Sequence, residues 1–202
     1  IGPLDDFFLN VPWYAILGNH DWGYGDYGAQ AQVDRTFATD DDVWNMPHRN
    51  YSMVYDLPSG GSLVVLYVDT TTLAPSEDRC CGDEGGIPYS TQYYNIHSQL
   101  VRMEESLQWA WQYAPRPFWL VVAGHYPIYT AGEHGDIEEL KNGTAFFMLL
   151  QRYKVHAYVC GHDHMACHLN TTYENICSDP VTNETSIVNK VEGFTSLDVV
   201  VF

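Results

Sequence analysis

Residues 157–164 have the sequence AYVCGHDH, in which four apolar residues lead directly into a glycine and a pair of histidines. The apolar run is typical of a buried strand, and Gly161 permits a tight turn at its end. His162 and His164 are two residues apart, so on an extended segment both imidazoles lie on one face and can reach one metal cluster. The stretch predicts a core strand that ends in metal-binding side chains.

Two further segments repeat this arrangement upstream. Residues 18–21 (GNHD) follow the apolar run 11–17, and residues 124–127 (GHYP) follow the apolar run 118–123. A single histidine after a buried strand is more often a structural, hydrogen-bonded residue. Three such segments in this order, each at the end of a strand, favour one shared functional site.

The rest of the chain alternates strands and helices. We predict strands at residues 51–57, 63–69, 157–160 and 197–202, helices at 97–114 and 145–153, and a long loop at 75–94. This alternation indicates an α/β fold, in which ligands bind beyond the carboxyl ends of the strands. Because no repeat or low-complexity linker interrupts the sequence, we expect residues 1–202 to form a single domain.

The charge balance excludes some classes of function. The chain has 202 residues, of which 46% are hydrophobic, and a formal net charge of −17 from nine Lys and Arg against 26 Asp and Glu. A nucleic-acid-binding protein needs a basic surface, which this composition does not supply. No apolar run is long enough to span a bilayer. Because an acidic surface repels anionic substrates, phosphate chemistry requires a local positive centre such as metal ions.

Glycosylation sequons point to a secreted protein. Four Asn-x-Ser/Thr sequons occur in the chain, at Asn50, Asn142, Asn170 and Asn183. One sequon arises often by chance, but four in largely polar, loop-like sequence favour an N-glycosylated extracellular protein.

The five cysteines fall into three groups. Cys160 lies in an apolar run and is predicted to be a buried free thiol. Cys167 and Cys177 flank a polar segment, which a disulfide between them can close. Cys80 and Cys81 lie in a glycine-rich stretch, and the sequence does not identify their partner.

The three histidine segments resemble the ordered carboxyl-terminal signature of the calcineurin-like metallophosphoesterases, Gly-Asn-His-Asp, Gly-His-Tyr-Pro and Gly-His-Asp-His. Trp22, residues 69–73 (DTTTL) and residues 133–135 (EHG) are similar to the purple, or tartrate-resistant, acid phosphatase branch. The resemblance covers the chain from about residue 12 to residue 202. It implies a layered β-sandwich of mixed sheets flanked by helices.

The resemblance also implies a binuclear metal centre. Asn19, His125 and His162 would bind a divalent ion, which is Fe, Zn or Mn, and His164 would bind the first metal, Fe(III). Imidazole nitrogens suit zinc and iron, and a neutral Asn oxygen leaves most of the charge of the ion uncompensated.

Catalytic roles follow from the same resemblance. His20 would face the substrate phosphate and assist the leaving oxygen, with Asp21 orienting its imidazole, while Glu133 and His134 would contact substrate and transfer protons. The implied activity is an acid phosphatase: a metal-bound hydroxide hydrolyses phosphate monoesters of small molecules or phosphoproteins, with an acidic pH optimum. The same resemblance implies that the protein is secreted or is located in a lysosome or vacuole.

Family members carry two further blocks upstream of the Asn-His segment, which supply two metal-binding aspartates and an iron-bound tyrosine. Asp5 and Asp6 do not stand in that context. We therefore expect this chain to be the carboxyl-terminal part of the domain, truncated at its amino terminus, and an N-terminal half of the same protein to supply the two Asp and the Tyr.

Two alternatives remain compatible with the sequence. One is a non-catalytic secreted glycoprotein that retains the phosphatase fold, which the acidity, the sequons and the incomplete ligand set allow. The other is a phosphodiesterase or nucleotide hydrolase of the same superfamily, because the histidine segments are shared across these chemistries.

Overall fold

The computed structural model describes residues 11–38, 43–74, 89–130, 132, 134–141, 143–164, 166–169, 175–178, 185–188 and 198–201. Side chains are described for fewer residues in the strands β7 to β10 and at the start of the long helix. Among the described residues, no helix is long and apolar enough to cross a membrane.

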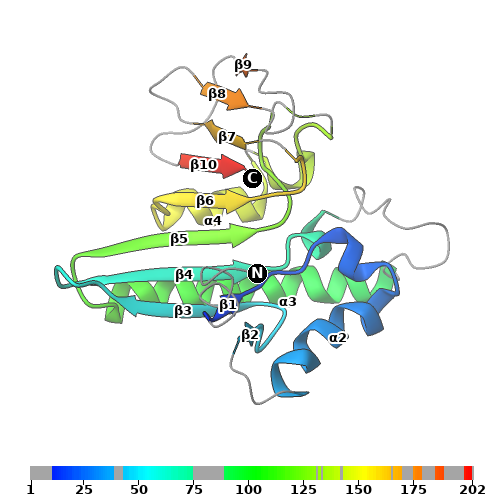
Figure 1. Ribbon diagram of the computed structural model, residues 1–202, viewed down its shortest axis with the longest axis horizontal. Helices are drawn as coiled ribbons and strands as arrows, with labels where there is room; N and C mark the ends of the chain where they lie inside the picture. The colour runs from blue at the N-terminus through cyan, green and yellow to red at the C-terminus, as the bar shows by residue number, and fades with distance from the viewer. Residues whose placement is uncertain are drawn as a thin grey trace, which may run out of the picture.

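An eight-stranded mixed sheet forms the centre of the molecule (Figure 1). Across the sheet the strands are β3 (Tyr51–Asp56), β4 (Ser62–Val68), β5 (Phe118–Gly124), β6 (Ala157–Cys160), β10 (Asp198–Val201), β7 (Ala166–Leu169), β8 (Asn175–Ser178) and β9 (Thr185–Val188). The strands from β4 to β10 in this order are parallel, and the pairs at both margins are antiparallel. A separate two-stranded ribbon pairs β1 (Trp13–Tyr14) with β2 (Trp44–Asn45).

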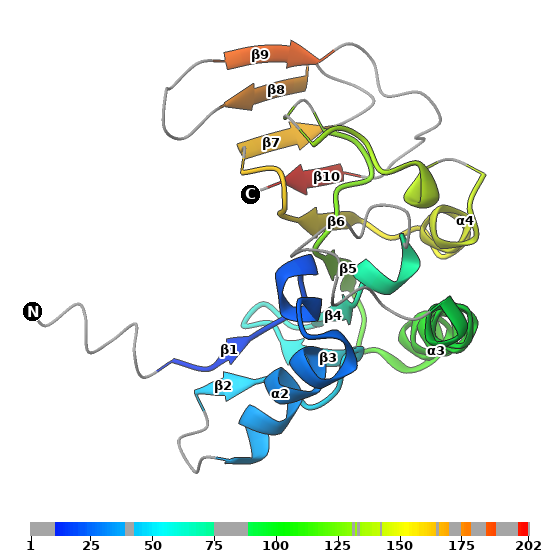
Figure 2. The same cartoon turned by 90° about the vertical axis from the view of Figure 1, so that its right-hand side faces the viewer.

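Two helices cover one face of the sheet. They are α3 (Tyr89–Tyr113) and α4 (Ala145–Arg152), and both lie on the same side of the strands in Figure 2. The third helix, α2 (Gly25–Ala38), packs beside the ribbon, and 3-10 turns form η1 (Asn19–Trp22), η2 (Thr71–Leu73) and η3 (Glu138–Leu140).

The core lies between the sheet and these two helices. Every second residue of β4 and β5 is buried toward the helices, as are Met103, Leu107 and Ala110 of α3. The helical spacing of these three positions forms the apolar stripe that the sequence predicted. Burial of each Val, Leu or Met side chain in this contact contributes about 1.5–3 kcal/mol, so the contact holds the two helices against the sheet.

The predicted elements are largely confirmed, with three corrections. The apolar run 11–17 forms only the two-residue strand β1. The loop predicted at 75–94 extends too far, because α3 begins at Tyr89; residues 75–88 lie outside the described part of the chain. The helix α2 was not predicted, because glycines at 25 and 28 obscure its pattern and only Ala29 and Val33 are buried on it.

The α/β architecture with mixed sheets and helices is confirmed, but the arrangement of the sheets differs from the predicted sandwich. The described strands form one large sheet and one short ribbon rather than two large sheets packed face to face. Consequently, the face of β5 opposite the helices is partly open, and Trp119 there is 59% exposed.

The cysteine predictions have separate outcomes. Cys160 is confirmed as a buried free thiol, and burial raises its pKa well above the usual range. Cys167 and Cys177 are register partners across β7 and β8, which is the backbone arrangement that a cross-strand disulfide requires. The disulfide itself stays a prediction, and Cys80 and Cys81 lie outside the described residues.

Candidate metal centre

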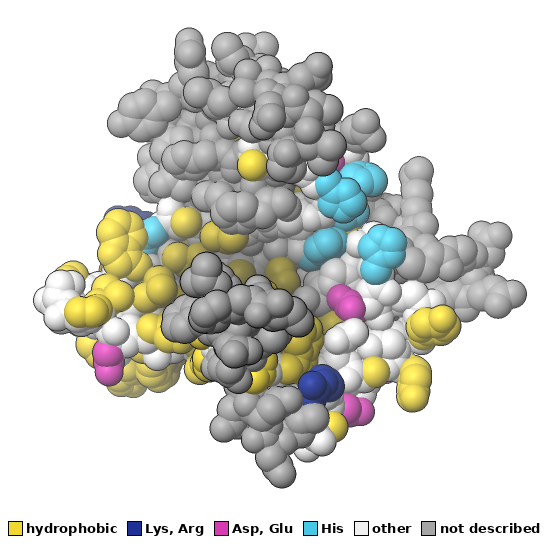
Figure 3. Space-filling view, viewed as in Figure 1, with side chains coloured by type: hydrophobic (Ala, Val, Ile, Leu, Met, Phe, Trp, Pro, Cys, Tyr) yellow, Lys and Arg dark blue, Asp and Glu magenta, His cyan; other side chains and the backbone are white. Residues whose placement is uncertain are grey.

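Segments that are far apart in the chain meet beyond the carboxyl ends of the parallel strands. β5 and β6 are parallel neighbours, so the residues that follow them leave the sheet at the same edge. His125 directly follows β5, His162 follows the end of β6, and η1 brings Asn19 to the same place. Figure 3 shows the histidine side chains gathered on this face of the molecule.

Three of the four predicted metal ligands are in direct contact. His125 Nε2 lies 2.8 Å from Asn19 Oδ1 and 3.2 Å from His162 Nδ1. The two imidazole rings are 5.0 Å apart, centroid to centroid, and cross at 74°. The sequence prediction that these side chains converge is therefore matched by the geometry, although their role as ligands remains to be tested.

Further histidines surround this contact. The ring of His134 lies 4.5 Å from the ring of His162 and 6.3 Å from the ring of His164. His162 and His164 both adopt left-handed backbone conformations, with φ of 74° and 52°. Such strain in residues that have a Cβ occurs mainly where the surrounding structure enforces it, and it concentrates at functional sites.

The electrostatic environment keeps the central imidazoles neutral. Burial, helped by the neighbouring His162, His20 and His164, lowers the pKa of His125 from 6.5 to about 4. Burial and His134 lower the pKa of His162 to about 4 as well, against the opposing charge of Asp163. Because both rings stay unprotonated in mildly acidic solution, their nitrogen lone pairs remain available to a metal ion under those conditions.

Backbone hydrogen bonds hold the turn that carries His125. Thr70 Oγ1 accepts hydrogen bonds from the backbone N–H of His125 at 3.0 Å and of Tyr126 at 2.9 Å. The carbonyl of His125 in turn accepts from Gly161 N at 3.0 Å, which ties the ends of β5 and β6 together. Thr70, the first threonine of the DTTTL segment, thus supports the site through its hydroxyl group, a role that the sequence did not predict.

The turn η1 is closed by Asp21. Its carboxylate Oδ2 accepts a hydrogen bond of 2.8 Å from the backbone N–H of Gly18, as in the cap of a helix. Gly18 is also in close contact with the ring of His125, where a Cβ would lie only 3.0 Å from Cε1. His20 is exposed at the rim of the cluster. The predicted role of Asp21 in orienting His20 stays a prediction, since this hydrogen bond is to the backbone.

Asp163 supports the opposite side of the cluster, and sequence analysis gave it no role. This carboxylate is only 6% exposed; it accepts hydrogen bonds from Thr130 Oγ1 and, at 2.9 Å, from the backbone N–H of His134. A Cβ on Gly132 would overlap it, so the chain has to pass close by without a side chain. Asp163 therefore fixes the loop that positions His134. Glu133 lies outside the described residues.

The donor set fits a metal ion. Ligands that share one ion with bonds of about 2.0–2.2 Å lie roughly 3 Å apart, and the Asn19–His125 and His125–His162 contacts of 2.8 and 3.2 Å have this spacing. Among the described residues, no three His, Cys, Asp or Glu side chains already surround a common point as a metal would require. The amide oxygen of Asn19 is the third polar atom at this spacing.

Comparison with known proteins identifies the family. The model of the calcineurin-like phosphoesterase family matches residues 2–166, most of the chain. The chain belongs to the calcineurin-like phosphoesterase family. Tartrate-resistant acid phosphatase type 5 of Homo sapiens is 31% identical over 161 residues, which are 79% of this chain and 45% of that relative. Purple acid phosphatase 3 of Arabidopsis thaliana is 30% identical over 174 residues, 83% of this chain and 42% of that relative.

A solved structure has the same fold. The Plasmodium protein GAP50, the anchor in the inner membrane complex, superposes with a TM-score of 0.62 at 19% identity, covering 94% of this chain and 48% of that chain. This phosphoesterase chain thus spans less than half the length of the relatives it matches. Members of the family typically carry a binuclear metal centre, and the whole histidine cluster lies within the matched residues.

Proposed function

We propose that this phosphoesterase is a metal-dependent acid phosphatase that hydrolyses phosphate monoesters at the histidine cluster. The observation that carries the proposal is the contact of Asn19, His125 and His162 through one imidazole nitrogen. A histidine with a purely structural role needs one hydrogen-bond partner for each ring nitrogen. His125 Nε2 instead has two, the amide oxygen of Asn19 and the imidazole of His162, both at the spacing of metal ligands. The similarity to purple acid phosphatases favours monoesters over other phosphate esters.

The donor set divides between two ions. Asn19, His125 and His162 would hold a divalent ion, Fe, Zn or Mn, and His164 would contribute to an Fe(III) site. Aspartate and tyrosine ligands from outside the matched region would complete the centre, since the relatives extend well beyond it. Once bound, the ions supply Lewis-acid polarisation of the phosphoryl oxygens.

The chain's own residues position the substrate and move protons. His20, exposed at the rim of η1, donates a proton to the departing oxygen of the ester. His134 lies over the ring of His162, held by Asp163, and with Glu133 it contacts the substrate and serves as a second proton-transfer group. Neutral His125 and His162 keep their lone pairs in acid, which supports an acidic pH optimum and a secreted, lysosomal or vacuolar location.

Activity of the full-length protein tests the proposal. Protein loaded with iron and zinc is assayed with p-nitrophenyl phosphate and bis-p-nitrophenyl phosphate, and we expect faster hydrolysis of the monoester. His125→Ala should reduce the rate by about 100-fold or more, because a lost ligand costs at least as much as a lost supporting contact. His97→Ala, on the exposed surface of α3, is the matched control.

Preferential hydrolysis of the diester would replace this function with that of a phosphodiesterase. Full-length protein that retains no metal and hydrolyses neither ester would overturn the proposal and favour a non-catalytic protein with this fold.

A further inference from the structure

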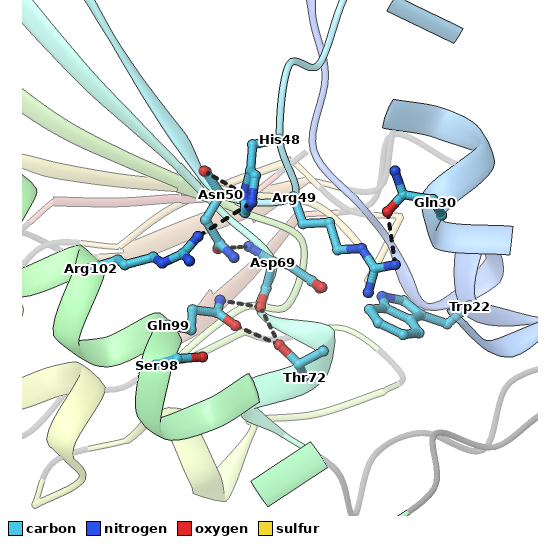
Figure 4. Close-up of a pocket in the computed structure, with 10 residues that line it drawn as sticks. All are labelled: Trp22, Gln30, His48, Arg49, Asn50, Asp69, Thr72, Ser98, Gln99 and Arg102. Carbon is cyan, nitrogen blue, oxygen red and sulfur yellow. Dashed lines mark hydrogen bonds between the residues drawn. The ribbon is translucent and has the colours of Figure 1, made fainter. Parts of the chain in front are cut away.

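A polar cavity lies at the Trp22 end of η1, whereas Asn19, at the other end of this turn, belongs to the histidine cluster. The cavity has a volume of about 270 Å³ and is lined by residues from η1, α2, α3 and the segments that flank β3 and β4. Figure 4 shows the side chain of Arg102 on one side and that of Arg49 extending toward Trp22 and Gln30, with His48, Asn50 and Asp69 between the two guanidinium groups. None of these residues belongs to the histidine segments, and the proposed phosphatase function does not use them.

Positive charge is concentrated at this cavity. Two of the nine Lys and Arg residues of a chain with net charge −17 line it. Burial and the charges of Arg102 and Arg49 lower the pKa of His48, which places both guanidinium groups near its ring. Arg102 Nη1 lies 3.3 Å from His48 Nε2, and among the described residues Arg102 has no carboxylate partner. The cavity is thus an electropositive site on an acidic protein.

Arg49 is held in a fixed position. Its guanidinium donates to Asp26 Oδ1 at 2.7 Å and to Gln30 Oε1 at 3.2 Å. It also stacks over the ring of Trp22 at 5.0 Å. A guanidinium held in this way loses little conformational freedom when it binds a ligand, so it is preorganised for binding.

The floor of the cavity has few acceptors to offer. Thr72 donates to Gln99 Oε1 at 2.6 Å, and Gln99 Nε2 donates to the carbonyl of Asp69, so these groups satisfy one another. Asn50 Oδ1 accepts from the backbone N–H of Asp69, and since this sequon residue lines the cavity, binding of a ligand there requires an unglycosylated Asn50. The indole N–H of Trp22, 1% exposed, lies beside Asp69 but has no hydrogen bond of normal geometry within the described residues. The unused hydrogen-bonding capacity is therefore mainly that of N–H donors.

Asp69 is the one carboxyl group at the floor. It is fully buried, and burial raises its pKa to about 7, against the opposing effects of Trp22, Thr71, Arg49 and Thr72. In mildly acidic solution this group is mostly neutral, so it adds no negative charge to the cavity. Asp26, the other carboxylate nearby, pairs with Arg49 and offsets its charge, so the net positive charge of the cavity is mainly that of Arg102.

We propose that this arginine cavity binds a small oxyanion, a phosphate group either free or carried on a small organic molecule. Two guanidinium groups with additional N–H donors match the anionic acceptor oxygens of a phosphate, and charge-assisted bonds of this kind are the strong ones. The site is separate from the metal centre, so binding does not depend on metal or on turnover.

Calorimetric titration with inorganic phosphate tests the proposal. The full-length protein is used at pH 5.5 after chelator treatment, so that no metal ion binds phosphate at the histidine cluster; His162→Ala, treated in the same way, serves as a second background. We expect one phosphate to bind per chain. Arg102→Gln should weaken the affinity by about 10-fold or more, because a charge-assisted contact is lost.

Arg116→Gln is the matched control. Arg116 is also exposed and lies 5.2 Å over Trp111, but it is remote from the cavity lining, so phosphate affinity should not change. Tighter binding of glycerol 3-phosphate than of phosphate would identify the occupant as an organic phosphate, and equal binding would identify free phosphate.

Equal affinities of the two arginine variants, or the absence of phosphate binding in metal-free protein, would overturn the proposal. Failure of the phosphatase function would leave this titration unaffected, so the two outcomes are distinguishable.

Discussion

The two ends of η1 belong to sites of opposite chemistry. At one end, Asn19 joins a cluster in which the pKa values of His125 and His162 are lowered to about 4. At the other end, Trp22 lies under Arg49 at the edge of the arginine cavity. Neutral imidazoles offer lone pairs to a cation, whereas guanidinium groups offer only charged donors to an anion. One short turn therefore separates a site suited to metal ions from a site suited to oxyanions.

Replacing a central histidine should have the largest effect on activity, and it should affect the metal centre but not the arginine cavity. His162→Ala leaves His125 and Asn19 without their third partner, so we expect loss of bound metal and a fall in phosphatase rate of about 100-fold or more. Metal analysis of the purified protein and steady-state kinetics measure the effect. His97→Ala is again the control, and unchanged metal content in His162→Ala would show that the cluster is a hydrogen-bonded structural feature.

Weakening the hydrogen bonds that hold the loop of His134 should have a smaller effect on the activity of the metal centre. Asp163→Asn exchanges one acceptor oxygen for an NH₂ group that faces the N–H of His134 or the hydroxyl of Thr130. We expect kcat to fall by about 10- to 100-fold through misplacement of His134, while bound metal is retained. A merely structural carboxylate would instead lower thermal stability and leave the kcat and the pH profile of the folded enzyme unchanged.

The sequence predicted that the histidine segments converge, because the information for this prediction is local. Two of the three histidine segments follow the apolar strands β5 and β6, and these parallel neighbours bring the residues that follow them to the same edge of the sheet. The apolar stripe through Met103 and Leu107 likewise predicted the helix that buries the sheet. These inferences depend on periodicity and on strand ends, which short windows of sequence contain.

The arginine cavity could not be predicted, because its contacts are long-range. Arg49 meets Asp26 across 23 residues, and Arg102 meets His48 across 54 residues. Neither pair has a motif, and the contacts exist only once α2 and α3 have docked beside β3. Asp163 is an intermediate case: it stands inside a predicted segment, but its function depends on Thr130, 33 residues away.

Neutralising the floor of the arginine cavity should change how stability depends on pH. Asp69 in the folded protein keeps its proton up to about pH 7, whereas in the unfolded chain it ionises near 3.8. The unfolded state therefore binds fewer protons between these values, and the contribution of Asp69 to the free energy of unfolding falls as pH rises from 5 to 7. We expect this fall to amount to about 1–2 kcal/mol and to be absent in Asp69→Asn.

Denaturant unfolding of both proteins at pH 5 and pH 7 measures this change. The buried imidazoles have the opposite effect, because the contribution of His125 and His162 to the free energy of unfolding decreases as pH falls from 6.5 toward 4. Their contribution is common to both proteins and cancels in the difference. Parallel pH profiles for wild type and Asp69→Asn would show that Asp69 does not hold a proton in the folded state.

The smallest change in stability should come from substitution of Trp22, which lies in η1, the turn that links the histidine cluster to the arginine cavity. Trp22→Phe keeps a ring beneath Arg49 but removes an indole N–H that has no hydrogen bond of normal geometry in the described part of the chain. Loss of a stronger cation–π contact costs about 0.5–1 kcal/mol, and removal of an unsatisfied buried donor offsets part of it. We therefore expect the free energy of unfolding to change by less than about 1 kcal/mol.

Phosphatase rate and phosphate affinity in Trp22→Phe then reveal whether the two sites are coupled. If η1 is held by Asp21 and by the contact of Gly18 with His125, the rate should stay within about 3-fold of wild type, since that difference corresponds to under 1 kcal/mol. Affinity for phosphate should weaken slightly, because one N–H donor is lost from the cavity. A large loss of rate with bound metal retained would mean that the indole positions Asn19 and His20, and the two ends of the turn would have to be treated as one site.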